Sequence, residues 1–305
     1  MRLLGVLATV FLAACGAPGG ITGATCGIRP FAEVPVRVVQ NVPLVDAVMN
    51  GAAVTLILDS GADRTVLTNE AARRVGLTFD QRDIRRGAGA GGVVSSFAAR
   101  VRRFELAGLS IPDHPVLATP HPLSGPQGER VDGLLPALVL SAFDVDLDMP
   151  GRKMTLYGGA VCGDTAIPAW AEPAVTVPAD FTAGPRVILR VRAGTAELRA
   201  LLDTGAQNMV ASARAAGSAG LTPADIAAGA PVTVRGVGPQ PVAAHLVRLP
   251  ELAIGPERGR NVPVIVTDSG LDKFDMILGM DYLGSRRLWL SYARRQVFIM
   301  VRPRQ

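Results

Sequence analysis

The sequence predicts a mostly β protein built from two copies of one lobe, and three observations lead to this prediction. Residues 56–62 read Leu-Ile-Leu-Asp-Ser-Gly-Ala, and residues 200–206 read Ala-Leu-Leu-Asp-Thr-Gly-Ala. Each tetrapeptide directly follows an apolar run of the kind that forms a buried strand. Similar short runs, punctuated by glycine and proline, continue along both halves, which is typical of β structure. Finally, the two aspartates, Asp59 and Asp203, lie 144 residues apart within halves that share further landmarks.

The shared landmarks occur in the same order in both halves. Gly76-Leu77-Thr78 matches Gly220-Leu221-Thr222 at a spacing of 144, and residues 131–135 match residues 274–278 at a spacing of 143. A repeat of this length is too long for a solenoid unit and fits a duplicated lobe. With 305 residues, of which 49% are hydrophobic, each half can bury a core of its own.

The first residues are predicted to be a targeting segment. Arg2 precedes the apolar stretch 3–12, which is too short to cross a bilayer, and residues 12–15 read Leu-Ala-Ala-Cys. This tetrapeptide resembles the bacterial lipobox, in which the cysteine is lipidated and becomes the first residue. We therefore expect a signal peptide at 1–15 with lipidation at Cys15, and, because Gly16 follows, a periplasmic lipoprotein anchored in the outer membrane. A cleaved secretory peptide that happens to contain a cysteine is the alternative.

The domain boundaries follow from composition. Residues 16–29 are rich in Gly, Ala and Thr and are predicted to be a tether. An N-terminal lobe is expected at 30–160, a proline-containing linker at 161–178 and a C-terminal lobe at 179–305. Strands are expected in the runs 34–39, 53–58, 97–106, 187–191, 198–202 and 262–266. The few helices are expected at 68–75 and 212–219, with short turns near 136–141 and 281–285.

Two cysteines remain when Cys15 is set aside. Cys26 and Cys162 flank the first lobe, one before it and one after it. In an oxidising periplasm we expect them to pair, which would tie the linker to the N-terminal lead-in. Free thiols are the alternative.

The charge distribution argues against a nucleic-acid partner. The net charge is +5, but the arginines are spread through both halves, and aromatic residues make up only 5% of the chain. A stacking platform for bases needs more aromatic side chains than this. The sequence therefore predicts a solvated basic surface.

The two aspartates suggest acid–base hydrolysis. Two carboxyl groups about 3 Å apart cannot both ionise, so they share one proton. The ionised member can take a proton from a water molecule, while the protonated member donates a hydrogen bond to a substrate carbonyl. Asp59 and Asp203 are therefore the candidate catalytic residues for hydrolysis of an amide without metal, cofactor or covalent intermediate.

The neighbouring residues suit a pair of facing loops. Ser60 and Thr204 carry hydroxyl groups that can join the loops through hydrogen bonds to the backbone. Gly61 and Gly205 allow the backbone to come close to the carboxylates.

The next position in each loop predicts the acidity of the site. Ala62 and Ala206 have no hydroxyl group with which to stabilise a carboxylate anion. Compared with a serine or threonine there, we expect a less depressed pKa of the pair and a milder acid optimum.

Two glycine-rich segments lie downstream at matching places. Residues 87–92 read Gly-Ala-Gly-Ala-Gly-Gly and residues 235–239 read Arg-Gly-Val-Gly-Pro. A phosphate-binding loop is disfavoured because neither segment has the accompanying lysine or strand–turn–helix pattern. Beside two aspartate loops they indicate flaps that close over an extended substrate. The candidate flap residues are Gly89, Gly91, Gly92, Gly236 and Gly238.

These motifs resemble those of the retropepsins, the retroviral-type aspartic proteases. Residues 59–67, Asp-Ser-Gly-Ala-Asp-Arg-Thr-Val-Leu, resemble their catalytic signature, and residues 276–283, Met-Ile-Leu-Gly-Met-Asp-Tyr-Leu, resemble their second signature. The resemblance covers residues 30–160 and 179–302. It implies two small closed β-barrel lobes related by a pseudo-two-fold axis, with the active site between them, in a monomer that is an intramolecular pseudo-dimer.

The sequence also departs from the family pattern. Asp63 matches the acid that binds the substrate backbone, but its counterpart in the second half is Gln207. An arginine that often partners this acid is absent, because Ala137 and Met280 occupy the matching places. We therefore expect an asymmetric cleft and a reduced or narrow activity.

The leading interpretation is an aspartic endopeptidase that acts on polypeptides. The alternative is a non-catalytic module that binds peptides or a cell-envelope partner on the same fold. Metal-dependent hydrolysis is disfavoured because His114, His121 and His245 do not have a known ligand spacing. Ser-His-Asp catalysis is disfavoured because the sequence has no Gly-x-Ser-x-Gly elbow.

Overall fold

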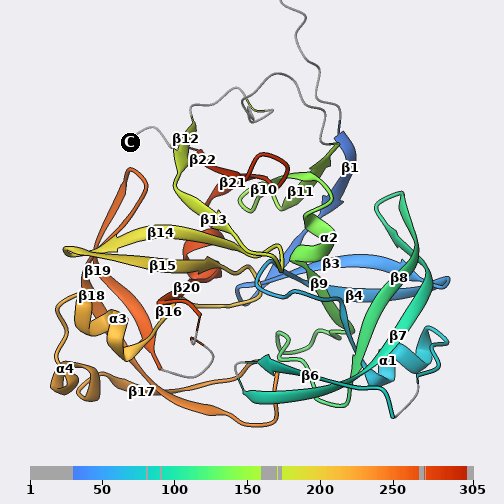
Figure 1. The fold of residues 1–305 in the computed structure, drawn as a ribbon, viewed down its shortest axis with the longest axis horizontal. Coiled ribbons are helices and arrows are strands. Elements are labelled where there is room, and N and C mark those ends of the chain that lie inside the picture. The colour runs from blue at the N-terminus through green and yellow to red at the C-terminus, as the bar shows by residue number, and fades with distance from the viewer. Residues whose placement is uncertain are drawn as a thin grey trace, which may run out of the picture.

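The structure is a computed structural model that describes residues 30–79, 82–89, 91–158, 170, 174–267, 271 and 273–300. It consists mainly of β-strands with a few short helices, arranged as two lobes side by side (Figure 1). The predicted fold class is therefore confirmed. No helix in these ranges is both long enough and apolar enough to cross a membrane.

The first lobe is an eight-stranded sheet with the order β2-β3-β4-β9-β5-β8-β7-β6. A further pairing of β3 with β7 curls the sheet round on itself. Its strands are β2 (Arg37–Val39), β3 (Val42–Met49), β4 (Ala52–Asp59), β5 (Val66–Thr68), β6 (Ile84–Gly89), β7 (Gly92–Leu106), β8 (Leu109–Thr119) and β9 (Gly133–Pro136).

The second lobe repeats this arrangement with the order β13-β14-β15-β20-β16-β19-β18-β17. The extra pairing of β14 with β18 corresponds to that of β3 with β7. Since the two orders match strand for strand, the duplication predicted from the sequence is a duplication of structure. The strands are β13 (Ala179–Phe181), β14 (Val187–Ala193), β15 (Ala196–Leu202), β16 (Val210–Ala211), β17 (Ala230–Val234), β18 (Val242–Ile254), β19 (Glu257–Val266) and β20 (Met276–Leu278).

A third sheet joins the two lobes along one side of the molecule, at the top of Figure 1. Its order is β1-β11-β10-β21-β22-β12, and the antiparallel pair β10–β21 connects strands from the two halves of the chain. The last residues of the predicted linker form one of its strands rather than a loop. The strands are β1 (Pro30–Pro35), β10 (Asp144–Asp148), β11 (Lys153–Tyr157), β12 (Ala174–Val177), β21 (Arg287–Ser291) and β22 (Gln296–Met300).

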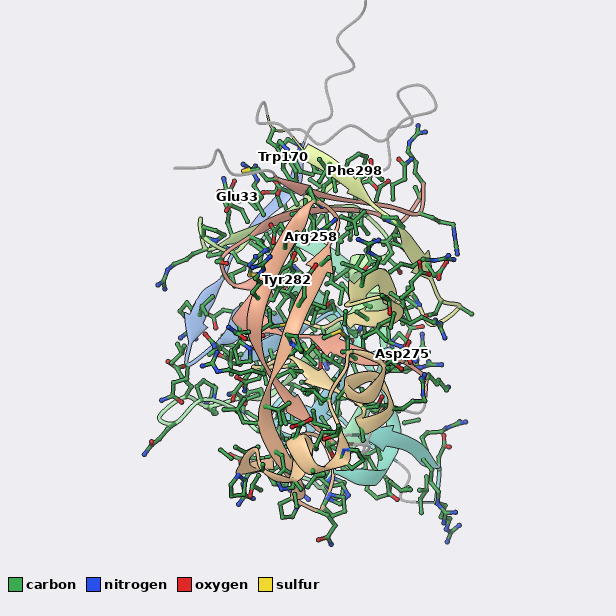
Figure 2. All side chains as sticks on the ribbon, turned by 90° about the vertical axis from the view of Figure 1, so that its left-hand side faces the viewer. Glu33, Trp170, Arg258, Asp275, Tyr282 and Phe298 are labelled. Atoms are coloured by element: carbon green, nitrogen blue, oxygen red, sulfur yellow. The ribbon has the colours of Figure 1, made fainter. Side chains whose placement is uncertain are left out.

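Aromatic side chains pack on this joining sheet. The Trp289 ring lies 4.8 Å from that of Tyr157 and 5.9 Å from that of Trp170, measured between centroids. Figure 2 shows Trp170 and Phe298 at the same end of the molecule. Arg287 stacks over Trp170 and forms an ion pair with the buried Asp146 from the other half of the chain. The two halves therefore meet in this sheet through apolar packing and through the buried ion pair between Arg287 and Asp146.

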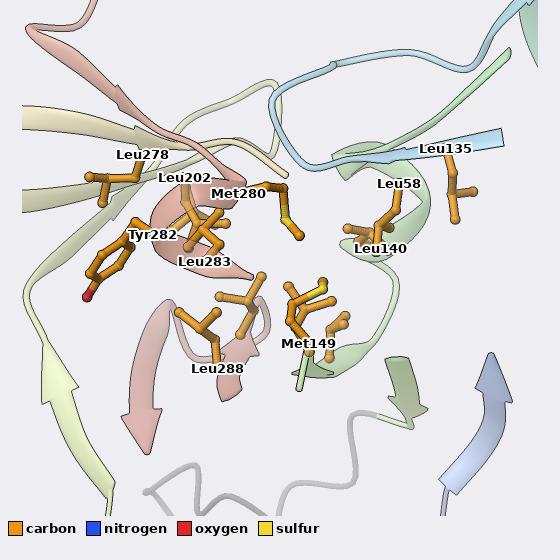
Figure 3. Packing of buried hydrophobic residues seen from close by; sticks show 14 of the residues in the cluster. Leu58, Leu135, Leu140, Met149, Leu202, Leu278, Met280, Tyr282, Leu283 and Leu288 are labelled. Carbon is orange, nitrogen blue, oxygen red and sulfur yellow. The ribbon is translucent and has the colours of Figure 1, made fainter. Parts of the chain in front are cut away.

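One hydrophobic core runs through both lobes. Figure 3 shows Leu58 and Leu140 of the first half beside Met280 and Leu283 of the second. Leu58 and Leu202, which directly precede the two aspartates, are fully buried. Because these leucines anchor the strand ends, the core fixes the positions of the aspartate loops.

The helices lie close to where the sequence predicts them. The hydroxyl of Thr68 caps α1 (Asn69–Arg74), and the hydroxyl of Ser212 caps α3 (Ala213–Ser218), each accepting a hydrogen bond from a backbone amide. The short turns are α2 (Ala137–Leu140) and α5 (Met280–Leu283).

The sequence analysis missed α4 (Pro223–Ala227). Its signal was readable, because Thr222 and Asp225 form a reciprocal capping box and Pro223 stands in the first turn.

Candidate active site

The two aspartates lie at equivalent strand ends. Asp59 is the last residue of β4, and Asp203 directly follows β15. β15 pairs in parallel with β20, which begins the second signature, and β4 pairs in parallel with β9, the equivalent strand of the first lobe. The parallel pairing holds each aspartate at the carboxyl end of a buried strand, where both loops turn toward the boundary between the lobes.

A reciprocal set of hydrogen bonds joins the two loops. The backbone N–H of Ser60 donates to Oγ1 of Thr204, and the N–H of Thr204 donates to Oγ of Ser60, each over 3.0 Å. The two hydroxyls in turn donate to carbonyl oxygens of the opposite lobe, at Leu202 over 2.8 Å and at Leu58 over 2.6 Å. Both hydroxyl side chains are buried, so these bonds are shielded from competing water.

Each carboxylate is held by its own loop in the same way. Oδ1 of Asp59 accepts hydrogen bonds from the amides of Gly61 and Ala62, over 3.0 and 2.9 Å. Oδ1 of Asp203 accepts them from the amides of Gly205 and Ala206, over 2.8 and 3.2 Å.

Each carboxylate also lies against the glycine of the opposite loop. A β-carbon added to Gly61 would lie 2.5 Å from Oδ2 of Asp203, and one added to Gly205 would lie 2.5 Å from Cγ of Asp59. A side chain at either glycine would therefore overlap a carboxyl group.

Burial raises the pKa of both carboxyl groups. Burial, together with the charge of Asp203 and the hydrogen bond to it, raises the pKa of Asp59 well above its usual range. Burial also raises the pKa of Asp203, but backbone hydrogen bonds, the bond from Asp59 and the positive charge of Arg186 oppose the rise. The pair therefore favours a state with one shared proton.

The expectation that Asp63 lacks an arginine partner is wrong. Nε of Arg186, which belongs to the other lobe, lies 2.8 Å from Oδ1 of Asp63. Reciprocal hydrogen bonds between Arg186 and Thr182 fix the backbone just before β14. The guanidinium also lies over the ring of Phe274, 5.3 Å from its centroid. Ala137 and Met280 occupy the places where the family pattern predicts this arginine, whereas here the facing lobe supplies it.

The two glycine-rich segments are hairpin tips that touch. The β6–β7 hairpin and the β17–β18 hairpin extend from opposite lobes and meet at the bottom of Figure 1. The amide of Gly91 donates to the carbonyl of Val237 over 3.1 Å, and the amide of Gln240 donates to the carbonyl of Gly91 over 3.2 Å. Gly89 and Gly238 face the opposite tip so closely that a β-carbon would collide with its backbone.

Apolar side chains lie between a hairpin tip and an aspartate loop. In the first lobe Val42, Leu44, Ile57 and Leu134 form a cluster against which Ala62 and the tip residue Val237 pack. The second lobe has the equivalent cluster, whose members are Ile188, Leu201, Val210, Leu271 and Phe274. Each lobe thus has an apolar cluster formed by equivalent strands.

His114, which the sequence disfavours as a metal ligand, takes no part in this geometry. His114 is buried and bonded to Thr65 over 2.7 Å between Nε2 and Oγ1. Within the described ranges no three His, Cys, Asp or Glu side chains are grouped so as to hold a metal ion. The predicted lipidation of Cys15 and the predicted pairing of Cys26 with Cys162 lie outside the described residues.

Comparison with known proteins gives one family. A family model described as aspartyl protease matches residues 45–137 and 187–282, one region in each lobe and more than half of the chain together. Each matched region contains one of the two aspartate loops. A comparison with curated proteins finds no match.

Proposed function

Because the chain belongs to the aspartyl protease family, we propose that it is an endopeptidase in which Asp59 and Asp203 together activate a water molecule. The observation that carries this proposal is that each carboxyl group lies against the glycine of the opposite aspartate loop, across the lobe boundary. Two carboxyl groups that are half-buried and held against each other's loops favour the singly protonated state that acid–base hydrolysis needs.

The proposed reaction needs only the pair, water and the peptide. The ionised carboxylate takes a proton from water as the water oxygen forms a bond to the carbonyl carbon. The protonated carboxyl group gives its proton to the carbonyl oxygen, which yields a tetrahedral diol. Collapse of the diol breaks the carbon–nitrogen bond, and the carboxyl that took the proton from water gives it to the leaving amine. One diol hydroxyl returns its proton to the other carboxylate as the carbonyl re-forms, which restores the singly protonated pair.

The surroundings of the pair support an extended polypeptide as the substrate. The touching hairpin tips can close over a chain and exclude water, and the apolar clusters on both sides can receive hydrophobic side chains. Asp63, at the end of the loop that carries Asp59, is the candidate acceptor for substrate backbone amides.

Cleavage of a peptide library between pH 3 and pH 7 tests the proposal. The purified chain is compared with Asp59→Asn, Asp203→Asn and the surface control Asp180→Asn, and pepstatin is added in a parallel series. We expect cleavage that pepstatin inhibits and that both dyad variants lose, while the control keeps it. Folded wild-type protein that cleaves nothing would favour the alternative, a module that binds peptides or an envelope partner.

We also propose that the chain is a lipoprotein of the cell envelope. The support is the sequence Leu12-Ala13-Ala14-Cys15 after a short apolar stretch. Mass spectrometry of the mature N-terminus tests this, since a chain that begins elsewhere or carries no lipid at Cys15 would contradict it.

A further inference from the structure

One polar contact supports the Asp59 loop, residues 59–65, from inside the first lobe. Oγ1 of Thr65, the last residue of this loop, lies 2.7 Å from Nε2 of His114. His114 belongs to β8, the strand that pairs in parallel with β5 directly after the loop. Both side chains are buried, and the His114 ring lies 5.2 Å from the ring of Phe104, measured between centroids. A titratable group therefore stands in the apolar core behind the loop.

The equivalent of Thr65 in the second lobe is an apolar residue. Thr65 and Met209 follow their aspartates at the same distance, at a spacing of 144 along the chain. Both make the same backbone contact, because the carbonyl of Thr65 accepts the amide of Leu117 over 2.9 Å, and that of Met209 accepts the amide of Ile265 over 3.0 Å. The two positions are therefore structurally equivalent.

The equivalent of His114 is apolar too. His114 stands three residues before Leu117, and Val262 stands three residues before Ile265. Val262 and Met209 both pack on the hydrophobic core. A buried hydrogen-bonded pair contributes no more stability than two well-packed apolar side chains at the same place. Stability alone therefore does not explain why the first lobe has a histidine here.

His114 has no counter-ion for a positive charge. Among the described residues no carboxylate forms an ion pair with it. Its charged neighbours, Arg100 on β7 and Asp113 on β8, are exposed and pair with each other. The other charged residues of the elements that pack on β8 are Asp63, Arg64, Glu70, Arg73, Arg74, Arg102, Arg103 and Glu105.

These surroundings oppose protonation of the ring. Burial, together with the positive charge of Arg100, lowers the pKa of His114 below its usual value. A proton on the buried ring would place an unpaired charge in the apolar core, which carries a high cost. Water solvates the charged ring better, and the ring reaches water only by giving up its contact with Thr65.

We propose that His114 makes the Asp59 loop acid-sensitive: the neutral ring holds Thr65 in place, and uptake of a proton releases it. Support from a histidine whose pKa is depressed by folding is complete above the unfolded value of about 6.5 and is lost as the pH falls through the value of the folded state. The Asp203 loop has no titratable group at this place. The effect on cleavage rests on the proposed function, since release of the loop that carries Asp59 would stop the reaction reversibly in acid.

Hydrogen exchange of the two loops in one sample tests the proposal, because the second lobe is an internal control. The protection of the amides of residues 60–68 is compared with that of residues 204–212 between pH 7 and pH 4, after correction for intrinsic exchange rates. We expect the ratio of the two to fall by up to about 10-fold per pH unit below pH ~6.5 and to level off below the pKa of folded His114.

Variants separate the histidine from the aspartate pair, which titrates in every sample. Thr65→Met combined with His114→Val gives the first lobe the apolar pair of the second and should abolish the fall. His114→Gln keeps a polar side chain that does not titrate in this range, so it should abolish the fall without the change in packing. His245→Gln, on β18, is the matched control and should behave as the wild type.

A fall in relative protection that the wild type shows and both His114 variants lose is the expected result. Equal protection of the two loops at every pH in the wild type, or the same fall in His114→Gln, would overturn the proposal. Cleavage supplies a second readout, because the acid limb of kcat/KM should extend to lower pH in His114→Gln. If the wild type cleaved no peptide, the proposed function would fail, while hydrogen exchange would still decide the role of His114.

Discussion

The hydroxyl of Thr204 donates a hydrogen bond to the carbonyl oxygen of Leu58 over 2.6 Å, although the two residues lie 146 positions apart. The same hydroxyl accepts the amide of Ser60, so one side chain of the second lobe satisfies two backbone groups of the first. Buried backbone groups that lose a partner carry a high cost. This relationship makes the positions of the two aspartates depend on each other, because neither loop can move without breaking bonds to the opposite lobe.

Thr204→Val should therefore destabilise the protein. The valine has the same shape but leaves the amide of Ser60 and the carbonyl of Leu58 without these bonds. We expect the free energy of unfolding in urea to fall by about 2 to 4 kcal/mol. The control Thr176→Val, at an exposed position of β12, should change it by less than about 0.5 kcal/mol. Equal effects of the two substitutions would show that the hydrogen bonds of Thr204 to the opposite lobe add no stability.

Gly61→Ala should remove most activity because it displaces a carboxyl group of the opposite lobe. The added methyl group would lie 2.5 Å from Oδ2 of Asp203, so that carboxyl group has to shift. A misplacement of about 1 Å in a catalytic group costs about 100-fold in rate, and kcat/KM should fall by about that factor. Gly217→Ala in α3 is the matched control, since a β-carbon there meets nothing within 4 Å. Full activity of Gly61→Ala would mean that cleavage does not depend on the close approach of the Asp203 carboxyl group to Gly61.

A large part of this site could be predicted from the sequence because its determinants are local and repeated. The strand that ends in Asp59 and the strand that directly precedes Asp203 are each encoded by an apolar run, and the hydroxyl and glycine that follow are encoded in the same loop. The hairpin glycines and the caps at Thr68 and Ser212 are local signals too.

Features that depend on how the lobes dock could not be predicted in this way. Arg186 precedes its own strand with no motif to mark it, and only the facing of the lobes brings it to Asp63. The pairing of β10 with β21 likewise joins residues that no short-range pattern connects. The missed α4 is different, because its capping box was present in the sequence.

Ala206→Ser should make the site more acidic. A hydroxyl at this position can hydrogen-bond to the ionised carboxylate of Asp203, which favours the charged form and lowers its pKa. The acid limb of the pH profile of kcat/KM should therefore move to lower pH, and the wild type should work best in mild acid. A wild-type optimum near pH 2 would contradict the role given to the alanines. Ala213→Ser in α3 serves as a control for an added hydroxyl away from the pair.

Gly238→Ala should impair closure of the hairpins. Gly238 has a φ of +139°, which a residue with a side chain rarely adopts, and an added β-carbon would lie 2.5 Å from the carbonyl carbon of Gly91. Since closure is proposed to hold the substrate, we expect KM to rise, by about 10-fold, more than kcat falls. Gly87→Ala, in the β6 strand of the opposite hairpin, is the control because a β-carbon there meets nothing within 4 Å. An unchanged KM would show that the meeting of the tips does not contribute to substrate binding.

Asp59→Asn should stabilise the fold at neutral pH while it abolishes cleavage. The folded protein raises the pKa of Asp59 mainly by burial, so at intermediate pH it binds a proton that the unfolded chain, with a pKa of about 3.9, has already released. Wild-type stability from this group is therefore complete below pH ~3.9 and is lost as the pH rises through the pKa of the folded state. The asparagine cannot ionise and avoids this loss, so the variant should gain stability over the wild type between pH 4 and pH 7.

Urea unfolding at several pH values measures the difference, with Asp180→Asn as the control for loss of an exposed carboxylate. A constant difference across this range would mean that the Asp59 carboxyl is not held protonated by the fold. The pair would then not hold the single proton on which the proposed proton transfer depends.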